Sequence, residues 1–126
     1  MQDPNTEAQK GDILWSDNNL NKSGRRAHYM VFIKPYDSHY FVGAMITHSK
    51  RFNNVQLEEK HFQKTDAKGC AFKVYFDNSL VVGNPLFKNL DWKPFEKVGQ
   101  LTEIGIAFIE NEILKFAPEF YADNSR

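Results

Sequence analysis

Apolar residues along the chain gather into short runs that are separated by polar turn residues. Two of these runs, residues 29–33 and 39–46, carry apolar side chains at successive positions, a pattern typical of strands buried on both faces. The turn residues 34–38 between them predict that the two runs pair as an antiparallel hairpin. Gly43 within the second run predicts a bulge or a close approach of another backbone. We therefore expect a buried hairpin at the centre of the fold.

Further short apolar runs predict additional strands, and one helix is expected near the end of the chain. The strand runs are residues 11–15, 55–57, 72–76 and 80–82. Such spacing is typical of a β-meander or a small barrel. Residues 86–97 contain proline and are expected to be irregular. Thr102 is predicted to cap a helix that begins near Glu103 and ends before Pro118.

A long polar segment, residues 16–27, precedes the hairpin, and long loops of this kind often carry function. Pairing of the two hairpin strands would bring the start of the first beside the end of the second. The side chains expected to meet there are those of Arg25, Arg26, His28, Thr47, His48 and Ser49. Cations, imidazoles and hydroxyls gathered in one place suit an anionic phosphodiester substrate.

The chain of 126 residues fits one domain, and its formal net charge of zero argues against a generic binder of polyanions. Charge is unevenly distributed, however. Residues 20–64 hold eight Lys and Arg against three acids, and residues 100–125 hold five acids against one Lys. A basic working half with an acidic second half is one interpretation, and two ordinary solvated faces are the other.

The remaining composition concerns the cellular compartment and possible cofactors. The single cysteine, Cys70, excludes an internal disulfide and is compatible with a reducing cytosol, where it is expected to be a structural thiol. No apolar run approaches the roughly 20 residues that span a bilayer, so no membrane contact is expected. No His, Cys or carboxylate spacing fits a metal site. We expect a cytoplasmic protein without metal or cofactor.

Four short motifs follow one another along the chain. They are Gly11-Asp12-Ile13, Gly24-Arg25-Arg26, Ile46-Thr47 and Val98-Gly99-Gln100-Leu101-Thr102. In this order and spacing they resemble the MazF/PemK family of toxins from toxin–antitoxin systems. The resemblance covers roughly residues 10–116. It implies a toxin domain over residues 11–117. Residues 1–10, which are polar and contain Pro4, are expected to be a disordered N-terminus, and residues 118–126 a C-terminal tail.

The resemblance implies an SH3-like antiparallel β-barrel with a C-terminal α-helix, assembled as a homodimer. Members of the family cut single-stranded RNA at short sequences and are inhibited by a cognate antitoxin protein. The position of the family's catalytic arginine corresponds to Arg26, and that of its catalytic threonine to Thr47. The implied activity is therefore that of a sequence-specific endoribonuclease.

The chemistry of metal-free RNA cleavage assigns further roles. A base accepts the 2′-OH proton, a cation stabilises the phosphorane, and an acid protonates the leaving 5′-oxygen. Arg26 can hold the phosphate with two parallel donors, and we hypothesise that His28 or His48 shares the acid–base work. The residues expected to bind substrate are Arg25, Ser49, Lys50 and Arg51.

Alternatives to this interpretation stay open at the level of sequence. Ala27 follows Arg26 where the family usually has proline, so a catalytically silent barrel that binds nucleic acid or a protein partner is the first alternative. A toxin aimed at a protein such as a topoisomerase is the second. His39 and His61 are expected at solvent or turn positions, and Thr47 is equally well an ordinary strand-end hydroxyl.

The large aromatic residues are expected mainly in the core or at an interface. They are Trp15, Tyr36, Phe52 and Trp92. An exposed ring among them would be able to stack on an RNA base, as in many single-strand binders.

Overall fold

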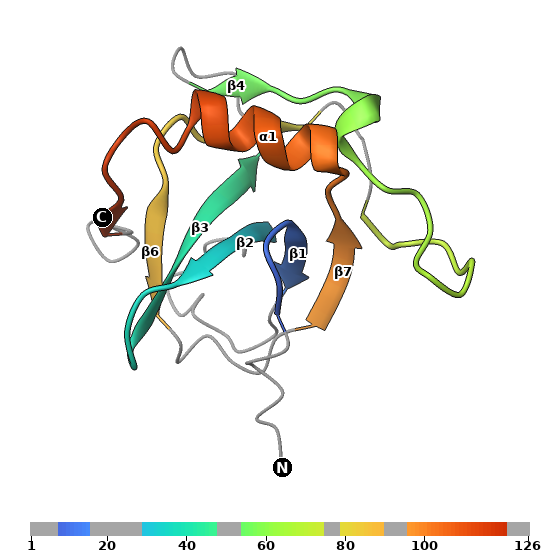
Figure 1. Ribbon diagram of the computed structural model, residues 1–126, viewed down its shortest axis with the longest axis horizontal. Coiled ribbons are helices and arrows are strands. Elements are labelled where there is room, and N and C mark those ends of the chain that lie inside the picture. The colour runs from blue at the N-terminus through green and yellow to red at the C-terminus, as the bar shows by residue number, and fades with distance from the viewer. Residues whose placement is uncertain (1–7, 16–28, 48–53, 75–78, 90–95, 121–126) are drawn as a thin grey trace, which may run out of the picture.

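A computed structural model of the protein describes residues 8–15, 29–47, 54–74, 79–89 and 96–120. Within these ranges the chain is mainly β, with one α-helix that follows the last long strand (Figure 1). The elements are β1 (Asp12–Trp15), β2 (Tyr29–Pro35), β3 (Tyr40–Thr47), β4 (Val55–Gln56), η2 (Glu59–His61), β5 (Leu80–Val81), β6 (Leu86–Asn89), β7 (Glu96–Gln100), α1 (Glu103–Glu112) and β8 (Glu119–Phe120). The predicted mainly β class and C-terminal helix are confirmed.

The described strands form one curved sheet. Its main path runs β4-β5-β3-β2-β1-β7, while β6 pairs with β3, and β8 pairs with β6. The β6–β8 pair is parallel and the other described pairs are antiparallel. Between β4 and β7 no ladder joins the described strands, so the sheet is open there.

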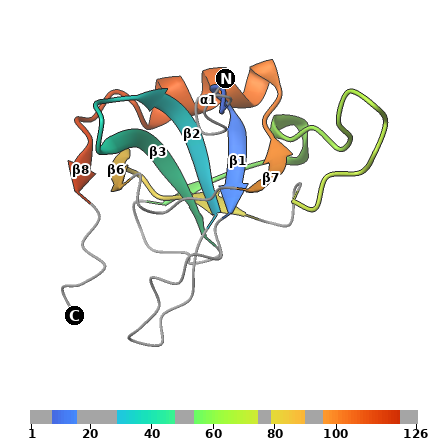
Figure 2. The same cartoon turned by 90° about the horizontal axis from the view of Figure 1, so that it is seen from below.

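The predicted hairpin of β2 and β3 is confirmed, and it lies inside the sheet rather than at its edge (Figure 2). Its register runs from Tyr29 opposite Ile46 to Pro35 opposite Phe41, and it shifts opposite Gly43. A Cβ at Gly43 would lie 2.9 Å from the Met30 side chain, and 3.0 Å from a backbone oxygen of β2. The close approach predicted as one of two possibilities for this glycine is therefore present, and the extra residue of the neighbouring bulge is Ile33 on β2.

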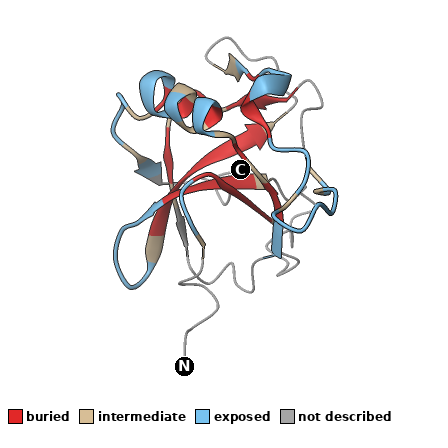
Figure 3. Cartoon of the chain, turned by 45° about the vertical axis from the view of Figure 1, so that its right-hand side comes forward, coloured by how far each residue is buried: buried red, intermediate tan, exposed pale blue. Residues whose placement is uncertain are grey.

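Burial on both faces of the sheet explains the continuous apolar runs of β2 and β3 (Figure 3). One face packs under α1, and its buried residues are Ile13, Val31, Ile33, Val42, Ala44, Ile46, Leu57, Phe62, Val81, Val98, Leu101, Ile109 and Ile113. The buried residues of the opposite face are Leu14, Met30, Phe32, Phe41, Met45 and Leu86. Alternate side chains of one strand thus enter different clusters.

Two expectations about strands need correction. Residues 86–89 form β6 rather than irregular chain, because Pro85 precedes the first strand residue, where the missing N–H does not interrupt the ladder. Residues 72–74 are not a strand. They belong to a projecting turn in which Phe72 N–H donates to Lys64 O at 3.0 Å, and only Val74 returns to β7 by a bond to Val98 O.

The N-terminus of α1 is capped as predicted and is tied to η2. Thr102 Oγ1 accepts the N–H of Gly105 at 3.1 Å and donates to Lys60 O at 2.8 Å. A Cβ at Gly105 would collide with the carbonyl of His61, so the two elements touch backbone to backbone. The helix itself ends at Glu112, before Pro118.

His61 was expected at a solvent or turn position; it lies in the single 3-10 turn of η2, but it is buried and not exposed to solvent. Its side chain is enclosed because η2 packs against the first turns of α1, where the imidazole stacks on Phe108 with ring centroids 4.4 Å apart. Its Nδ1 accepts the backbone N–H of Glu58 at 2.9 Å. Burial lowers the pKa of His61 below 6.5, opposed by the Glu58 carboxylate and reinforced by the Lys60 ammonium. His39, by contrast, is exposed as expected.

Candidate functional site

Four strands end or begin together at one end of the sheet. Tyr29 lies opposite Ile46, the neighbour of Thr47, and Trp15 lies opposite Glu96. Trp15 also contacts Tyr29, with ring centroids 5.2 Å apart. Figure 1 shows the arrowhead of β1 beside the start of β7. We call Thr47, Tyr29, Trp15 and Glu96 the strand-end row.

Of the site residues predicted from sequence, Thr47 lies in the described part of the chain. Arg25, Arg26, His28, His48, Ser49, Lys50 and Arg51 lie outside the described residues. Thr47 is half-buried at the end of β3 and pairs with Leu80 of β5. The β2–β3 register brings the first residue of β2 beside the end of β3. The described strands therefore agree with the prediction that the start of the first hairpin strand lies next to the end of the second.

The aromatic rings of the strand-end row close one end of the core. Trp15 and Tyr29 are both half-buried and pack against the cluster under α1, in agreement with the core position expected for Trp15. Tyr36 lies at the other end of the hairpin. It is 58% exposed and packs on Phe87 at 4.6 Å between centroids, so it is a surface ring.

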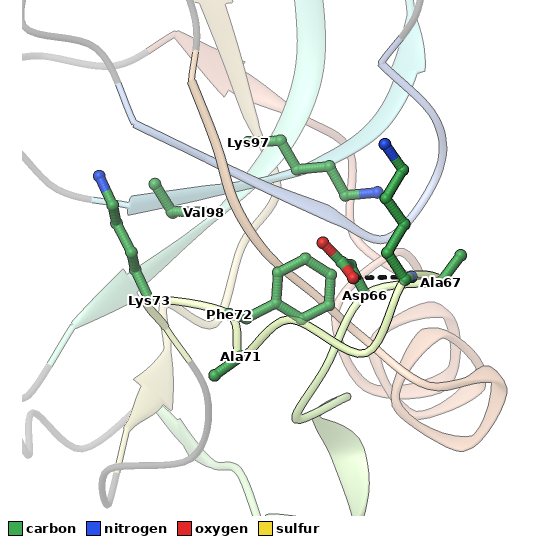
Figure 4. A pocket seen from close by; sticks show the side chains of 8 residues that line it. Asp66, Ala67, Ala71, Phe72, Lys73, Lys97 and Val98 are labelled. Atoms are coloured by element: carbon green, nitrogen blue, oxygen red, sulfur yellow. Dashed lines mark hydrogen bonds between the residues drawn. The ribbon is translucent and has the colours of Figure 1, made fainter.

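Beyond Glu96 the row leads to a hollow that sequence reasoning missed. This hollow, here called the lysine groove, has a volume of about 490 Å³ (Figure 4). Its lining residues are Asp66, Ala67, Lys68, Ala71, Phe72, Lys73, Lys97 and Val98. The lining residues come from β7 and from the projecting turn that precedes it in the chain. Neither segment contains a local sequence motif from which the groove could have been predicted.

Lys97 is held in the groove by a buried partner. Its Nζ lies 3.2 Å from Asp12 Oδ1 and donates to Gln100 Oε1 at 3.0 Å. The Asp12 side chain is only 5% exposed, and its other oxygen accepts the N–H of Gln9 at 2.9 Å. Lys97 Nζ also lies 5.8 Å from the centre of the Phe72 ring, within the range of a cation–π contact.

The other charges of the groove are held more loosely or have a local role. Lys73 Nζ pairs with Glu96 Oε2 at 2.6 Å, but both side chains are exposed. Asp66 Oδ1 accepts the N–H groups of Lys68 and Cys70, at 2.8 and 3.0 Å, and so shapes the turn. No ion pair to Lys68 is present among the described residues.

Cys70 is exposed on this turn rather than buried in the core, which corrects its interpretation as a structural thiol: its N–H donates to Asp66 Oδ1 at 3.0 Å and its carbonyl accepts the N–H of Asp66 at 2.8 Å, so the residue belongs to the surface turn itself. In the described part of the chain no three His, Cys, Asp or Glu side chains gather closely enough to hold a metal ion. The described residues also include no helix of the length and hydrophobicity that a membrane span requires.

Comparison with known proteins adds no relative. A scan against protein-family models matches no family, and searches of curated proteins and of solved structures find no significant match. The resemblance to MazF/PemK toxins therefore rests on the four motifs of the sequence.

Proposed function

We propose that the protein is a MazF/PemK-like endoribonuclease toxin that cuts single-stranded RNA at short sequences without a metal ion. The observation that carries the proposal is the register of β2 and β3, in which Tyr29 lies opposite Ile46. The segment with Arg26 joins β2 and the segment with His48 leaves β3, so both are attached at one end of the sheet beside Thr47.

In the proposed reaction the guanidinium of Arg26 binds the scissile phosphate and stabilises the charge that grows on its non-bridging oxygens. The hydroxyl of Thr47 donates to one of these oxygens. His28 or His48 exchanges protons with the 2′-oxygen and the leaving 5′-oxygen. The 2′-oxygen displaces the 5′-oxygen at phosphorus, which leaves a 2′,3′-cyclic phosphate and a free 5′-hydroxyl. No cofactor takes part.

The proposed fold is an SH3-like barrel, and contacts at the outer edge of β7 support it. Phe62 bridges to Leu101, and Gln63 N–H donates to Gln100 O at 2.8 Å. Val74 N–H donates to Val98 O at 2.9 Å. The chain that follows β4 thus reaches the far edge of the sheet, which is the connection that a small barrel requires.

The proposed setting is the cytoplasm, with a homodimer as the active form and a cognate antitoxin as the inhibitor. A gene for a short acidic protein directly upstream would support the antitoxin.

The test is cleavage of end-labelled single-stranded RNA pools in EDTA by the wild type and by Arg26→Ala. We expect the wild type to release fragments ending in a cyclic or 3′-phosphate, and the variant to be slower by about 100-fold or more. Lys34→Ala is the matched control, because it removes one exposed cation from the opposite end of β2 and should cleave normally.

Two results contradict the proposal. One is equal cleavage by the wild type and Arg26→Ala, which indicates a contaminating nuclease. The other is absence of cleavage by the wild type. In that case RNA binding without cleavage favours the silent barrel, and absence of both favours a protein target.

A further inference from the structure

We propose that the lysine groove is a second contact for single-stranded RNA, in which one base stacks on Phe72 and the flanking phosphates meet Lys68, Lys73 and Lys97. The groove volume of about 490 Å³ lies within the range of small-molecule sites, about 300–1,000 Å³. The inference rests on the proposed function only in taking RNA as the ligand.

Phe72 supplies the surface for the base. The ring is half-buried, so part of it faces the groove, and Val98 is buried beneath the same hollow. Ala67 and Ala71 are small, which leaves the ring accessible from the side of the projecting turn. Stacking of bases on aromatic rings is the usual way in which proteins hold single strands without reading their sequence.

The lysines are placed for phosphates on both sides of such a base. In Figure 4 the Lys73 ammonium group lies to the upper left of the Phe72 ring and the Lys97 ammonium group to its upper right. Lys97 is fixed by the buried Asp12, whereas Lys73 is held by the exposed Glu96. An exposed ion pair contributes little stability, so a phosphate can replace Glu96 at small cost.

The charges of the groove also limit its affinity. The three ammonium groups are balanced by the carboxylates of Asp12, Asp66 and Glu96. Attraction therefore depends on stacking and on exchange of Glu96 for phosphate, and binding should be modest and sensitive to salt. Removal of the Glu96 charge should strengthen it.

The strand-end row connects this groove to the end of β3. Glu96 opposes Trp15, Trp15 contacts Tyr29, and Tyr29 lies beside the end of β3. Three strand spacings separate β3 from β7, or about 14 Å along the sheet. A strand of RNA bound near Thr47 thus reaches the groove within a few nucleotides and passes two half-buried aromatic rings.

The experiment measures binding of fluorescein-labelled 2′-O-methyl oligonucleotides, which cannot be cleaved, by anisotropy. Octamers of uridine and of adenosine serve as probes because the groove is expected to tolerate any base. We expect Phe72→Ala to weaken binding by about fivefold or more, and Lys68→Ala to weaken it and lower the salt dependence. Glu96→Gln should tighten binding by about two- to fivefold.

The Glu96→Gln variant controls for misfolding, because a variant with a damaged fold would not bind the oligonucleotide more tightly than the wild type. Phe116→Ala and Lys115→Ala are matched controls. Lys115 lies 5.5 Å from the centre of the Phe116 ring, and Phe116 is 46% exposed, so the same chemistry occurs away from the groove. Both controls should bind like the wild type.

Binding that is unchanged in Phe72→Ala and Lys68→Ala overturns the inference. Displacement of the RNA by poly-glutamate at equal ionic strength also overturns it, because poly-glutamate has charge but no base to stack on Phe72. Its failure is distinguishable from failure of the proposed function. Cleavage by the wild type with no effect of the groove variants ends the inference alone. Groove-dependent binding without any cleavage ends the nuclease proposal alone.

Discussion

The backbone carbonyl of His61 occupies the place where a side chain at Gly105 would project. This contact joins η2 to the first turn of α1, next to the bond from Thr102 N–H to His61 O at 2.9 Å. Backbone atoms cannot rotate away as the end of a flexible side chain can. The glycine is therefore required by packing, although glycine is a poor residue for the interior of a helix.

Gly105→Ala should destabilise the protein by about 2–3 kcal/mol, because the new methyl group forces η2 and α1 apart. Helix propensity alone gives the opposite sign, since alanine is favoured over glycine by about 1 kcal/mol. Urea unfolding of the variant measures the sign. Asn111→Ala, an exposed change in the same helix, should be neutral or slightly stabilising. A stabilised Gly105→Ala variant would show that the contact is not tight.

The protonation of His61 should make stability depend on pH. Its pKa is lowered in the folded state by burial, with Glu58 opposing and Lys60 reinforcing the effect. Between the lowered folded pKa and the ordinary value of about 6.5, the unfolded chain binds more protons than the folded one. The contribution of His61 is therefore fully present above about pH 6.5 and is lost as pH falls toward the folded pKa.

Measurement of unfolding free energy from pH 5 to pH 8 checks this prediction. The wild type should lose stability on acidification more steeply than His61→Gln, by up to about 1.4 kcal/mol per pH unit. His39→Ala removes an exposed histidine and should retain the wild-type slope. Equal slopes in the wild type and His61→Gln would mean that the imidazole titrates normally.

The extent to which structure could be predicted from sequence differs between elements. The hairpin was predictable because β2 and β3 carry apolar residues at successive positions, as strands buried on both faces do. The residues between the two strands form a turn. The cap at Thr102 was predictable because capping is a local interaction. Both depend on neighbours within a few residues in the chain.

The burial of His61 and the lysine groove depend on contacts between distant segments. His61 stands among Glu58, Glu59 and Lys60, so its local pattern is that of an exposed turn, and only the approach of Phe108 encloses it. Phe72 and Lys97 are likewise far apart in sequence and meet because Val74 pairs with Val98. Such positions are fixed by tertiary packing and leave little local signal.

The pair of Asp12 and Lys97 should be asymmetric in its effect on stability. The Asp12 side chain is 5% exposed, whereas Lys97 is partly solvated. Lys97→Met leaves a buried carboxylate without its cation and should destabilise the protein by about 3 kcal/mol or more. Asp12→Asn leaves an ammonium group that water can reach, so its effect should be smaller.

A double-mutant cycle in urea tests the asymmetry, with Lys73→Met as the control for an exposed lysine paired at the surface. The double variant Asp12→Asn/Lys97→Met should be more stable than Lys97→Met alone, because no buried charge remains unpaired. Equal losses for the two single variants would indicate that water reaches Asp12 as readily as Lys97.

Substitutions of Thr47 separate its hydroxyl from its place in the sheet. Thr47 pairs with Leu80 and is half-buried, so Thr47→Val preserves shape and strand preference while it removes the hydroxyl. In the proposed nuclease this variant should cleave RNA more slowly by about 10- to 100-fold, and Thr47→Ser should retain most activity. Single-turnover cleavage and thermal unfolding of the two variants provide the comparison.

The same assay applied to His28→Ala and His48→Ala tests the acid–base hypothesis. A general acid or base contributes about 100-fold or more, so at least one variant should be slower by far more than about threefold. For Thr47→Val, cleavage at the wild-type rate would mean that the threonine hydroxyl takes no part in the reaction and that Thr47 is only the last residue of β3. The exposed His39, at the other end of the hairpin, is the matched control, and His39→Ala should cleave at the wild-type rate.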